Sequence, residues 1–414
     1  MKHTAWTLGI LLSLSAATAS AATPLTLDEA LHLAVSQHPS VAVRMNQREA
    51  ASEALNGARR GLWPSLAAQT GKDAYGKDQL TLRVEQPLWT GGRLTAEIAG
   101  ADANLQAAEA QLIESRQDIM LRAANTYTEL GRVEARQAAA RINVAEHERL
   151  HAQIQRRIEG QVTSGSDGLL ADARLSQARA ELAQLQALGA RARATLEQIV
   201  GRPVGTIESA PPQRASPANL DATLDAASGY SPTLQRLAAQ EKIAEAQVRA
   251  SLGQALPQVK LRHDQTQGGQ QAGGQTYVGL EYQTGAGLNI LSAMKQAESR
   301  RMAARAERDA ALRETQDAVR ADWSDWSSLT AQASELDLQV KASEQVYDSF
   351  VRQYAVGRKS WLEVLNAQRE LSQARYALAD VHWGALRTLL KLQLATGALS
   401  TTTAPGTIRS ERHD

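Results

Sequence analysis

The fold is decided by residues 351–378, VRQYAVGRKSWLEVLNAQRELSQARYAL. A helix runs up to Gly357, which breaks it, and Ser360 is a good residue to start the next one. From there apolar or small residues recur in alternating steps of three and four: Val364, Ala367, Leu371, Ala374, Leu378, Val381, Ala385, Thr388 and Leu392. This spacing is typical of a coiled-coil seam and predicts long helices packed side by side.

A short segment of this stretch also occurs earlier in the chain, which indicates a duplication. LSQAR occupies residues 175–179 and again 371–375, a shift of 196 residues. Far from this segment, residues 27–39 and Pro64 match residues 220–232 and Pro257 with a shift of 193, and Glu85, Tyr127 and Gly201 match Glu281, Trp323 and Gly397 with a shift of 196. Each half therefore has one predicted order: two short helices, an alternating strand pair, a very long helix, a turn and a second long helix.

The predicted organisation has five parts. Residues 1–22 are a signal peptide, with basic Lys2, an apolar run and small residues near the expected cleavage point. Residues 23–203 are the first repeat (two short helices, strand pair 65–89, long helices 93–159 and 167–200), and residues 204–219 are a Pro-rich linker. Residues 220–399 are the second repeat (strand pair 257–283, long helices 291–355 and 360–396), and residues 400–414 are a flexible tail. A helix over 93–159 would be roughly 100 Å long, which no compact domain accommodates.

Composition excludes several classes of protein. With 45 basic and 44 acidic residues, the chain has no electrostatic basis for binding nucleic acid. It has no cysteine, which excludes disulfides and thiol chemistry. After the signal peptide no window reaches the roughly 18 apolar residues that a membrane helix needs. We therefore expect an exported protein that is periplasmic, secreted or embedded as β-structure in an outer membrane.

The predicted strands alternate between apolar and polar residues. One face of the strands carries Leu80, Leu82 and Val84 in the first half, and Val259, Leu261, Val278, Leu280 and Tyr282 in the second. Strands of about ten residues with this alternation suit a membrane β-barrel, and Trp63 and Trp89 stand where an interfacial aromatic girdle would lie. An amphipathic hairpin on a soluble sheet is the alternative. Four strands cannot close a barrel, so the membrane interpretation requires oligomerisation.

One catalytic pattern occurs, at His147, Glu148 and His151, which match the H-E-x-x-H motif of zinc peptidases. A peptidase also needs a third ligand in a walled cleft, and the sequence offers none at a suitable spacing. The motif lies in the longest predicted helix, where such residues usually decorate the solvated face. We therefore interpret it as fortuitous and expect no enzyme activity, no metal site and no cofactor.

Several motifs together resemble the TolC family of outer-membrane channel proteins. They are the signal peptide, the duplicated unit, L-x-E-A-L-x-L-A near residue 27, Q-P-L-W-x-G-G-R at residues 86–93 and Y-x-x-G-x-x-S-x-x-x-V-L-x-A-Q at residues 354–368. The resemblance implies a mostly α-helical homotrimer. Each protomer would give four strands to an outer-membrane β-barrel that continues into a long periplasmic α-helical barrel.

The resemblance also implies roles for residues at the periplasmic tip. Glu363 and Asn366 would line the constriction, although Asn366 departs from the doubly acidic pattern of some members, and Lys359 and Tyr354 would help to hold the tip shut. The turns that dock a periplasmic adaptor would contain Gly165, Ser166, Gly357, Arg358 and Ser360.

The function implied is that of an exit duct, which receives substrate from an inner-membrane ABC or proton-driven transporter through the adaptor. The sequence of residues 357–371 favours type I protein secretion, with multidrug or metal efflux as the alternative. Two other classes stay open at this point, a soluble periplasmic coiled-coil adaptor and a metallopeptidase.

Overall fold

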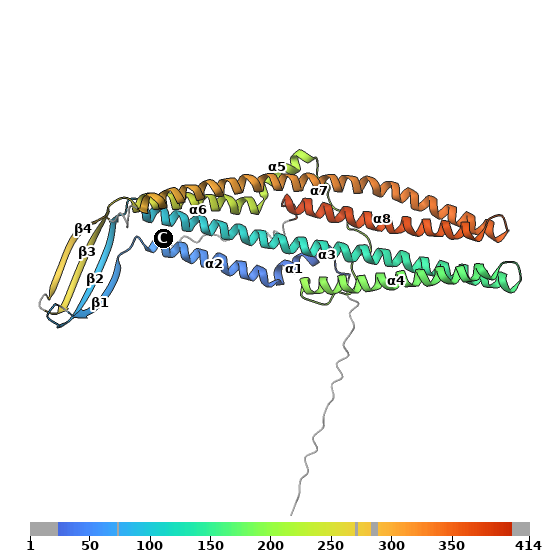
Figure 1. The fold of residues 1–414 in the computed structure, drawn as a ribbon, viewed down its shortest axis with the longest axis horizontal. Helices are drawn as coiled ribbons and strands as arrows, with labels where there is room; N and C mark the ends of the chain where they lie inside the picture. The colour runs from blue at the N-terminus through green and yellow to red at the C-terminus, as the bar shows by residue number, and fades with distance from the viewer. Residues whose placement is uncertain (1–23, 73, 270–271, 283–288, 400–414) are drawn as a thin grey trace, which may run out of the picture.

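The computed structural model describes residues 24–72, 74–269, 272–282 and 289–399, so the predicted signal peptide and tail lie outside the described residues. The molecule is elongated, with a sheet at one end and helices along its length (Figure 1). The first half contains α1 (Leu27–Gln37), α2 (Pro39–Arg60), β1 (Ser65–Lys72), β2 (Asp78–Trp89), α3 (Arg93–Glu159) and α4 (Gly165–Val200). The second half contains α5 (Leu220–Tyr230), α6 (Pro232–Gln254), β3 (Gln258–Gly268), β4 (Gly273–Glu281), α7 (Asn289–Ala355) and α8 (Trp361–Ala395).

The two halves repeat the same order of elements, and α3 and α7 each have 67 residues. The mostly helical fold with four strands that the sequence predicts is therefore observed. Local signals set the helix ends: the Thr26 hydroxyl caps α1 by accepting from the Glu29 N–H at 3.2 Å. Gly201 and Gly397 both have φ 75° just after α4 and α8, in the left-handed region that glycine adopts without strain.

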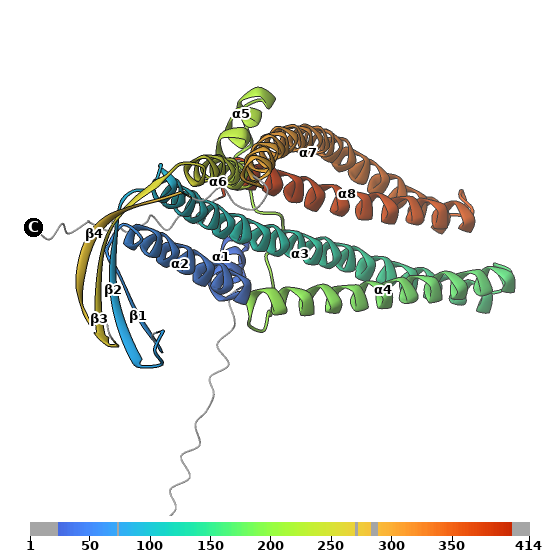
Figure 2. The same ribbon diagram turned by 60° about the vertical axis from the view of Figure 1, so that its left-hand side comes forward.

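Helix α3 is the central element, since it packs against α2, α4, α6 and α8, while α7 packs against α5, α6 and α8. Two helical hairpins, α3 with α4 and α7 with α8, extend away from the sheet and end in turns at the far end of the molecule (Figure 2). The largest core cluster joins α1, α3, α4 and α8 and includes fully buried Tyr127, Leu196 and Leu390. The Tyr127 hydroxyl donates to the carbonyl of Leu25 at 2.9 Å and so ties the start of the described chain to α3.

The sheet has the order β1-β2-β3-β4, and every neighbouring pair is antiparallel. The β2–β3 pairing joins the two halves of the chain, with Arg83 opposite Asp264. Among the described residues, no helix contains a stretch long and apolar enough to cross a membrane.

Candidate functional site

The first candidate surface is one face of the sheet. Residues opposite each other in an antiparallel pair point to the same side, and Leu261 is opposite Val278 while Val259 is opposite Leu280. By the same register the seven predicted face residues that lie in strands share one side: Leu80, Leu82, Val84, Val259, Leu261, Val278 and Leu280. Tyr282 was predicted to lie in a strand, but it lies one residue beyond the end of β4.

This face is uncovered in the single chain. Val278 and Leu280 are 62% and 72% exposed, and Leu66 of β1 joins them at 75%. The face is not uniformly apolar, because His263 and Gln265 of β3 lie on it closer to the hairpin tips. The period of two identifies the face, but the polar half of β3 interrupts the apolar pattern that the sequence predicts.

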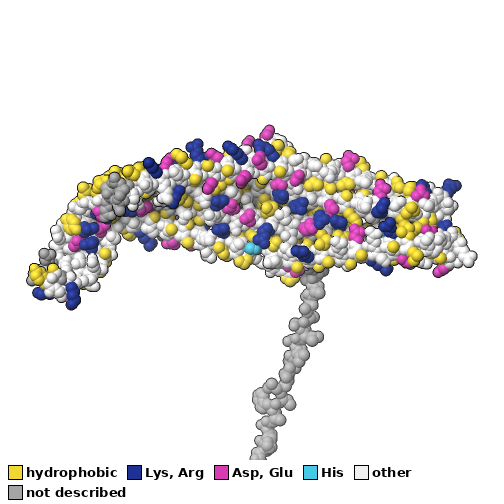
Figure 3. Space-filling view, viewed as in Figure 1, with side chains coloured by type: hydrophobic (Ala, Val, Ile, Leu, Met, Phe, Trp, Pro, Cys, Tyr) yellow, Lys and Arg dark blue, Asp and Glu magenta, His cyan; other side chains and the backbone are white. Residues whose placement is uncertain are grey.

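The opposite face of the sheet carries ion pairs that run across three strands. Arg83 of β2 contacts Asp264 of β3 at 2.7 Å. Glu85 contacts both Arg262 at 2.6 Å and Lys260 at 3.0 Å, and Lys260 reaches Glu281 of β4 at 3.0 Å. These contacts join three cations to three anions, so this face carries no excess of charge. Figure 3 likewise shows positive and negative side chains intermixed along the visible face of the helices.

The second candidate site is the turn between α7 and α8. Ser360 and Glu363 form a capping box: the Ser360 hydroxyl accepts from the Glu363 N–H at 3.3 Å, and the Glu363 carboxylate accepts from the Ser360 N–H at 2.9 Å. The Lys359 ammonium donates to the same carboxylate at 2.7 Å and lies 4.4 Å from the centre of the Phe350 ring. Lys359 and the donors of Ser360 lower the pKa of Glu363 to about 2. The carboxylate therefore stays charged and is held at the start of α8.

Tyr354 is buried beside this turn, at 5% exposure. Its ring packs against Trp361 with the ring centres 5.7 Å apart, and the Arg157 guanidinium lies 4.7 Å from the centre of the Tyr354 ring. Arg157 also donates to the Tyr354 carbonyl at 3.4 Å and so connects the end of α3 to the end of α7. Trp361 and Arg157 were not among the residues predicted for the tip. An aromatic residue directly after the capping Ser360 was the available signal.

The structure places the other predicted tip residues as follows. Gly357, at φ 75°, Arg358 and Ser360 lie in the turn between α7 and α8. Gly165 and Ser166 were predicted in the other tip turn, but Ser164 caps α4 and both residues belong to its first helical turn. α4 consequently begins two residues before the predicted position 167. The role of Gly165 and Ser166 in docking an adaptor stays a prediction.

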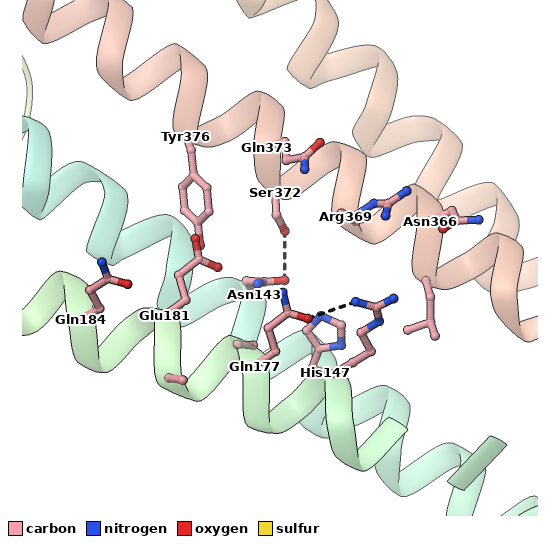
Figure 4. A pocket seen from close by; sticks show the side chains of 14 residues that line it. Asn143, His147, Gln177, Glu181, Gln184, Asn366, Arg369, Ser372, Gln373 and Tyr376 are labelled. Atoms are coloured by element: carbon pink, nitrogen blue, oxygen red, sulfur yellow. Dashed lines mark hydrogen bonds between the residues drawn. The ribbon is translucent and has the colours of Figure 1, made fainter. Parts of the chain in front are cut away.

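Asn366 lies three residues after Glu363 and lines a groove of about 500 Å³ between α4 and α8 with α3 at its base (Figure 4). Arg174 and Glu181 of α4 line the groove, as do Arg369 and Tyr376 of α8. The groove thus contains polar side chains from two helical hairpins that are far apart in sequence.

The three residues of the H-E-x-x-H motif contact different neighbours and do not converge on one point. His147 lines the groove, and burial, with Arg174 nearby, lowers its pKa. The Glu148 carboxylate accepts from Arg179 at 2.7 Å, and the His151 ring lies 2.7 Å from the Asp172 carboxylate. No group of three potential metal ligands occurs in the described part of the chain. The motif residues therefore help to join α3 to α4.

Comparison with known proteins agrees with this arrangement. The chain is 24% identical to the alkaline protease secretion protein AprF of Pseudomonas aeruginosa, over 91% of this chain and 85% of the relative. The outer membrane protein VceC of Vibrio cholerae has the same fold, with a TM-score of 0.79 and 20% identity over 90% of this chain and 96% of that one. The MtrE outer membrane channel of Neisseria gonorrhoeae, solved in its open state, matches with a TM-score of 0.75 and 17% identity over 90% and 88% of the two chains.

The family model described as outer membrane efflux protein matches residues 30–202 and 223–398, and so covers both halves of the duplication. This chain belongs to the outer membrane efflux protein family.

Proposed function

We propose that this protein is the outer-membrane exit duct of a tripartite export system. Three copies combine their four-stranded sheets into one closed barrel in the outer membrane, and their long helices form a tunnel across the periplasm. An inner-membrane ABC or proton-driven transporter delivers substrate through a periplasmic adaptor. The protein itself conducts passively and catalyses no reaction.

The observation that carries this proposal is the sheet. Its apolar face is uncovered, its opposite face is lined with paired charges, and β1 and β4 each have a strand neighbour on one side only. In lipid, unpaired backbone groups at such edges are costly, so a spanning sheet has to close on itself. Pairing β4 of one copy with β1 of the next closes the ring and places the apolar face against lipid.

The helices support the same oligomer. Over its 67 residues α7 buries only Ala297, Val319, Tyr347 and Tyr354 in the single chain. It leaves Leu291, Met302 and Leu338 exposed at 56%, 60% and 61%. A helix with so little buried surface packs against a further partner, and in the proposed trimer that partner is the neighbouring copy.

The tip of the hairpins is the proposed gate. The capping box and Lys359 hold the carboxylate of Glu363 at the start of α8, which would give a ring of three carboxylates around the threefold axis. Asn366 lies three residues further along α8 and adds amides to that constriction. The turns at residues 160–164 and 356–360 are the proposed contacts for the adaptor.

Type I protein secretion is the proposed route, because AprF is named for the secretion of an alkaline protease. Efflux of small molecules is the second candidate, because the family model is described by efflux. Deleting the gene in its host separates the two. Loss of a polypeptide from the culture medium with unchanged drug and metal tolerance supports secretion, and the reverse result supports efflux.

The duct itself is tested in membrane fractions. We expect the mature protein in the Sarkosyl-insoluble outer-membrane fraction, as a trimer that dissociates on heating. The purified protein should also form discrete conducting channels in planar lipid bilayers. A monomer released into osmotic-shock fluid would refute the proposal and favour a soluble periplasmic adaptor.

A further inference from the structure

A buried polar cluster joins α3 to α8 inside the hairpin bundle. The side-chain oxygen of Asn143 on α3 accepts from the Ser372 hydroxyl at 2.9 Å and from the Gln368 amide at 3.1 Å. Gln368 is 0% exposed, and Asn143 and Ser372 are each 7% exposed. We call these three residues the polar node. Figure 4 shows Asn143 and Ser372 meeting between the two helices beside the groove.

Apolar packing surrounds the polar node on both sides along the helices. Toward the tip lies a cluster that contains Leu150, Ile154 and Leu365, and toward the middle of the molecule Ala140 and Leu185 pack with the ring of Tyr376 on α8. Apolar contacts have no direction, so they stabilise neighbouring registers of two helices almost equally. The hydrogen bonds of the polar node are directional and favour one alignment of α3 with α8.

The node is poorly suited to a purely stabilising role. The side-chain oxygen of Gln368 has no hydrogen-bond partner within the described residues although it is fully buried. A buried acceptor without a partner opposes folding, and replacing a whole buried polar cluster by apolar groups of similar shape is often neutral or stabilising. A buried polar residue in a helical seam is instead a known way to fix register at a cost in stability.

We infer that Asn143, Gln368 and Ser372 fix the axial register of α8 against α3 and thereby position the gate residues at the start of α8. This inference rests on the proposed duct function. A slip of one helical turn moves a helix by about 5.4 Å. Since Glu363 lies five residues before Gln368, such a slip would move its carboxylate by the same distance relative to the tip of α3 and α4.

A second set of contacts between these helices is weaker. Arg132 contacts Asp380 at 2.9 Å, and Arg136 reaches the same carboxylate at 3.5 Å. The Asp380 side chain is 40% exposed, and solvent screens ion pairs of this kind. Gln117 of α3 also donates to the Leu394 carbonyl of α8 at 2.9 Å, but this bond is only partly buried. The node is the place where buried side chains of α3 and α8 hydrogen-bond to each other.

The test replaces the whole node, with Asn143→Leu, Gln368→Leu and Ser372→Ala in one variant. The matched control is Gln137→Leu, because Gln137 is also buried on α3 but donates to the Leu185 carbonyl of α4, at 2.9 Å. The chain has no cysteine, so Arg132→Cys with Asp380→Cys, joined by a short bis-maleimide reagent, gives a cross-link that reports the α3–α8 register. Closed-state conductance in planar bilayers and the melting temperature complete the measurements.

We expect the node variant to melt at or above the wild-type temperature, to lose most of the cross-link and to leak several-fold more current at rest. The control should keep the cross-link and the low resting current. A node variant that melts lower but keeps full cross-linking and a tight closed state would overturn the inference, because the node would then be only structural. If wild-type protein forms no channels, the proposed function fails, while cross-linking of the purified protein still decides the register.

Discussion

Gly131 is the position where a single methyl group should disturb the core most clearly. It lies in α3, and a Cβ atom added there would lie 2.3 Å from Cη2 of Trp383 on α8. Trp383 is 2% exposed, and its ring lies 6.4 Å from that of fully buried Tyr127, so it has little room to move. Carbon atoms pack comfortably at about 3.5–4.0 Å. Gly131→Ala therefore forces the indole to shift by more than about 1 Å.

Two opposing effects set the size of the change. Overpacking a close-packed core costs about 1–3 kcal/mol, whereas alanine is about 1 kcal/mol better than glycine inside a helix. Gly57→Ala in α2 isolates the second effect, the gain in helix propensity, because nothing lies within 4 Å of the Cβ position there. The propensity gain is common to both variants, so the difference between their unfolding free energies should equal the clash, about 1–3 kcal/mol.

The assay is denaturant unfolding of the purified protein in detergent, followed by the helical circular dichroism signal. We expect Gly57→Ala to be more stable than wild type and Gly131→Ala to be less stable than Gly57→Ala. Adding Trp383→Leu to Gly131→Ala should restore part of the loss, as a favourable coupling between the two sites. Equal stability of Gly131→Ala and Gly57→Ala would show that the predicted contact with Trp383 does not constrain the core.

Three further predictions follow from other parts of the structure. Val84→Arg should cut the yield of outer-membrane trimer, since a cation on a lipid-facing strand costs up to about 2–4 kcal/mol, whereas Thr81→Arg on the opposite face should assemble normally; equal yields would contradict the assigned face. The pKa of Glu363 is depressed to about 2 from an ordinary 4.5. The stabilisation that its charged carboxylate gives to the tip is therefore fully present above pH 4.5 and is lost as the pH falls through about 2. Resting conductance should therefore be flat from neutral pH to about pH 5, and Glu363→Ala with Lys359→Ala should raise it at every pH; a rise in wild-type leak near pH 6 would argue against this assignment. Tyr127→Phe removes the hydroxyl that ties the N-terminal segment to α3, and hydrogen exchange of the Leu25 and Thr26 amides should quicken by about fivefold, for a bond worth about 1 kcal/mol; unchanged exchange would show that the bond is not limiting.

Much of the candidate site could be read from local sequence. Ser360 followed by Glu363 predicts a helix start, and the structure has a complete capping box there. The alternation around Leu82 and Leu261 identifies one face of each strand, because successive side chains of a strand point to opposite sides whatever the strand pairs with. The roles of Glu363 and Asn366 in a gate stay predictions.

Other features depend on partners that the local sequence does not reveal. Gln368 and Ser372 flank the predicted seam of α8 and have the composition of a solvated face, yet both are buried because α3 covers them. Tyr354 was predicted as a tip contact, and its burial depends on Arg157, 197 residues earlier in the chain.

The sequence by itself determined the duplication, the lengths of the helices, their caps and the apolar face of each strand, because these follow from the local repeat of 3.6 or 2 residues and from single capping residues. Only the tertiary structure decided which polar residues are buried and how α3 aligns with α8. The physical reason is that burial and axial register are properties of a pair of elements, and the members of these pairs lie more than two hundred residues apart, as Asn143 and Gln368 do.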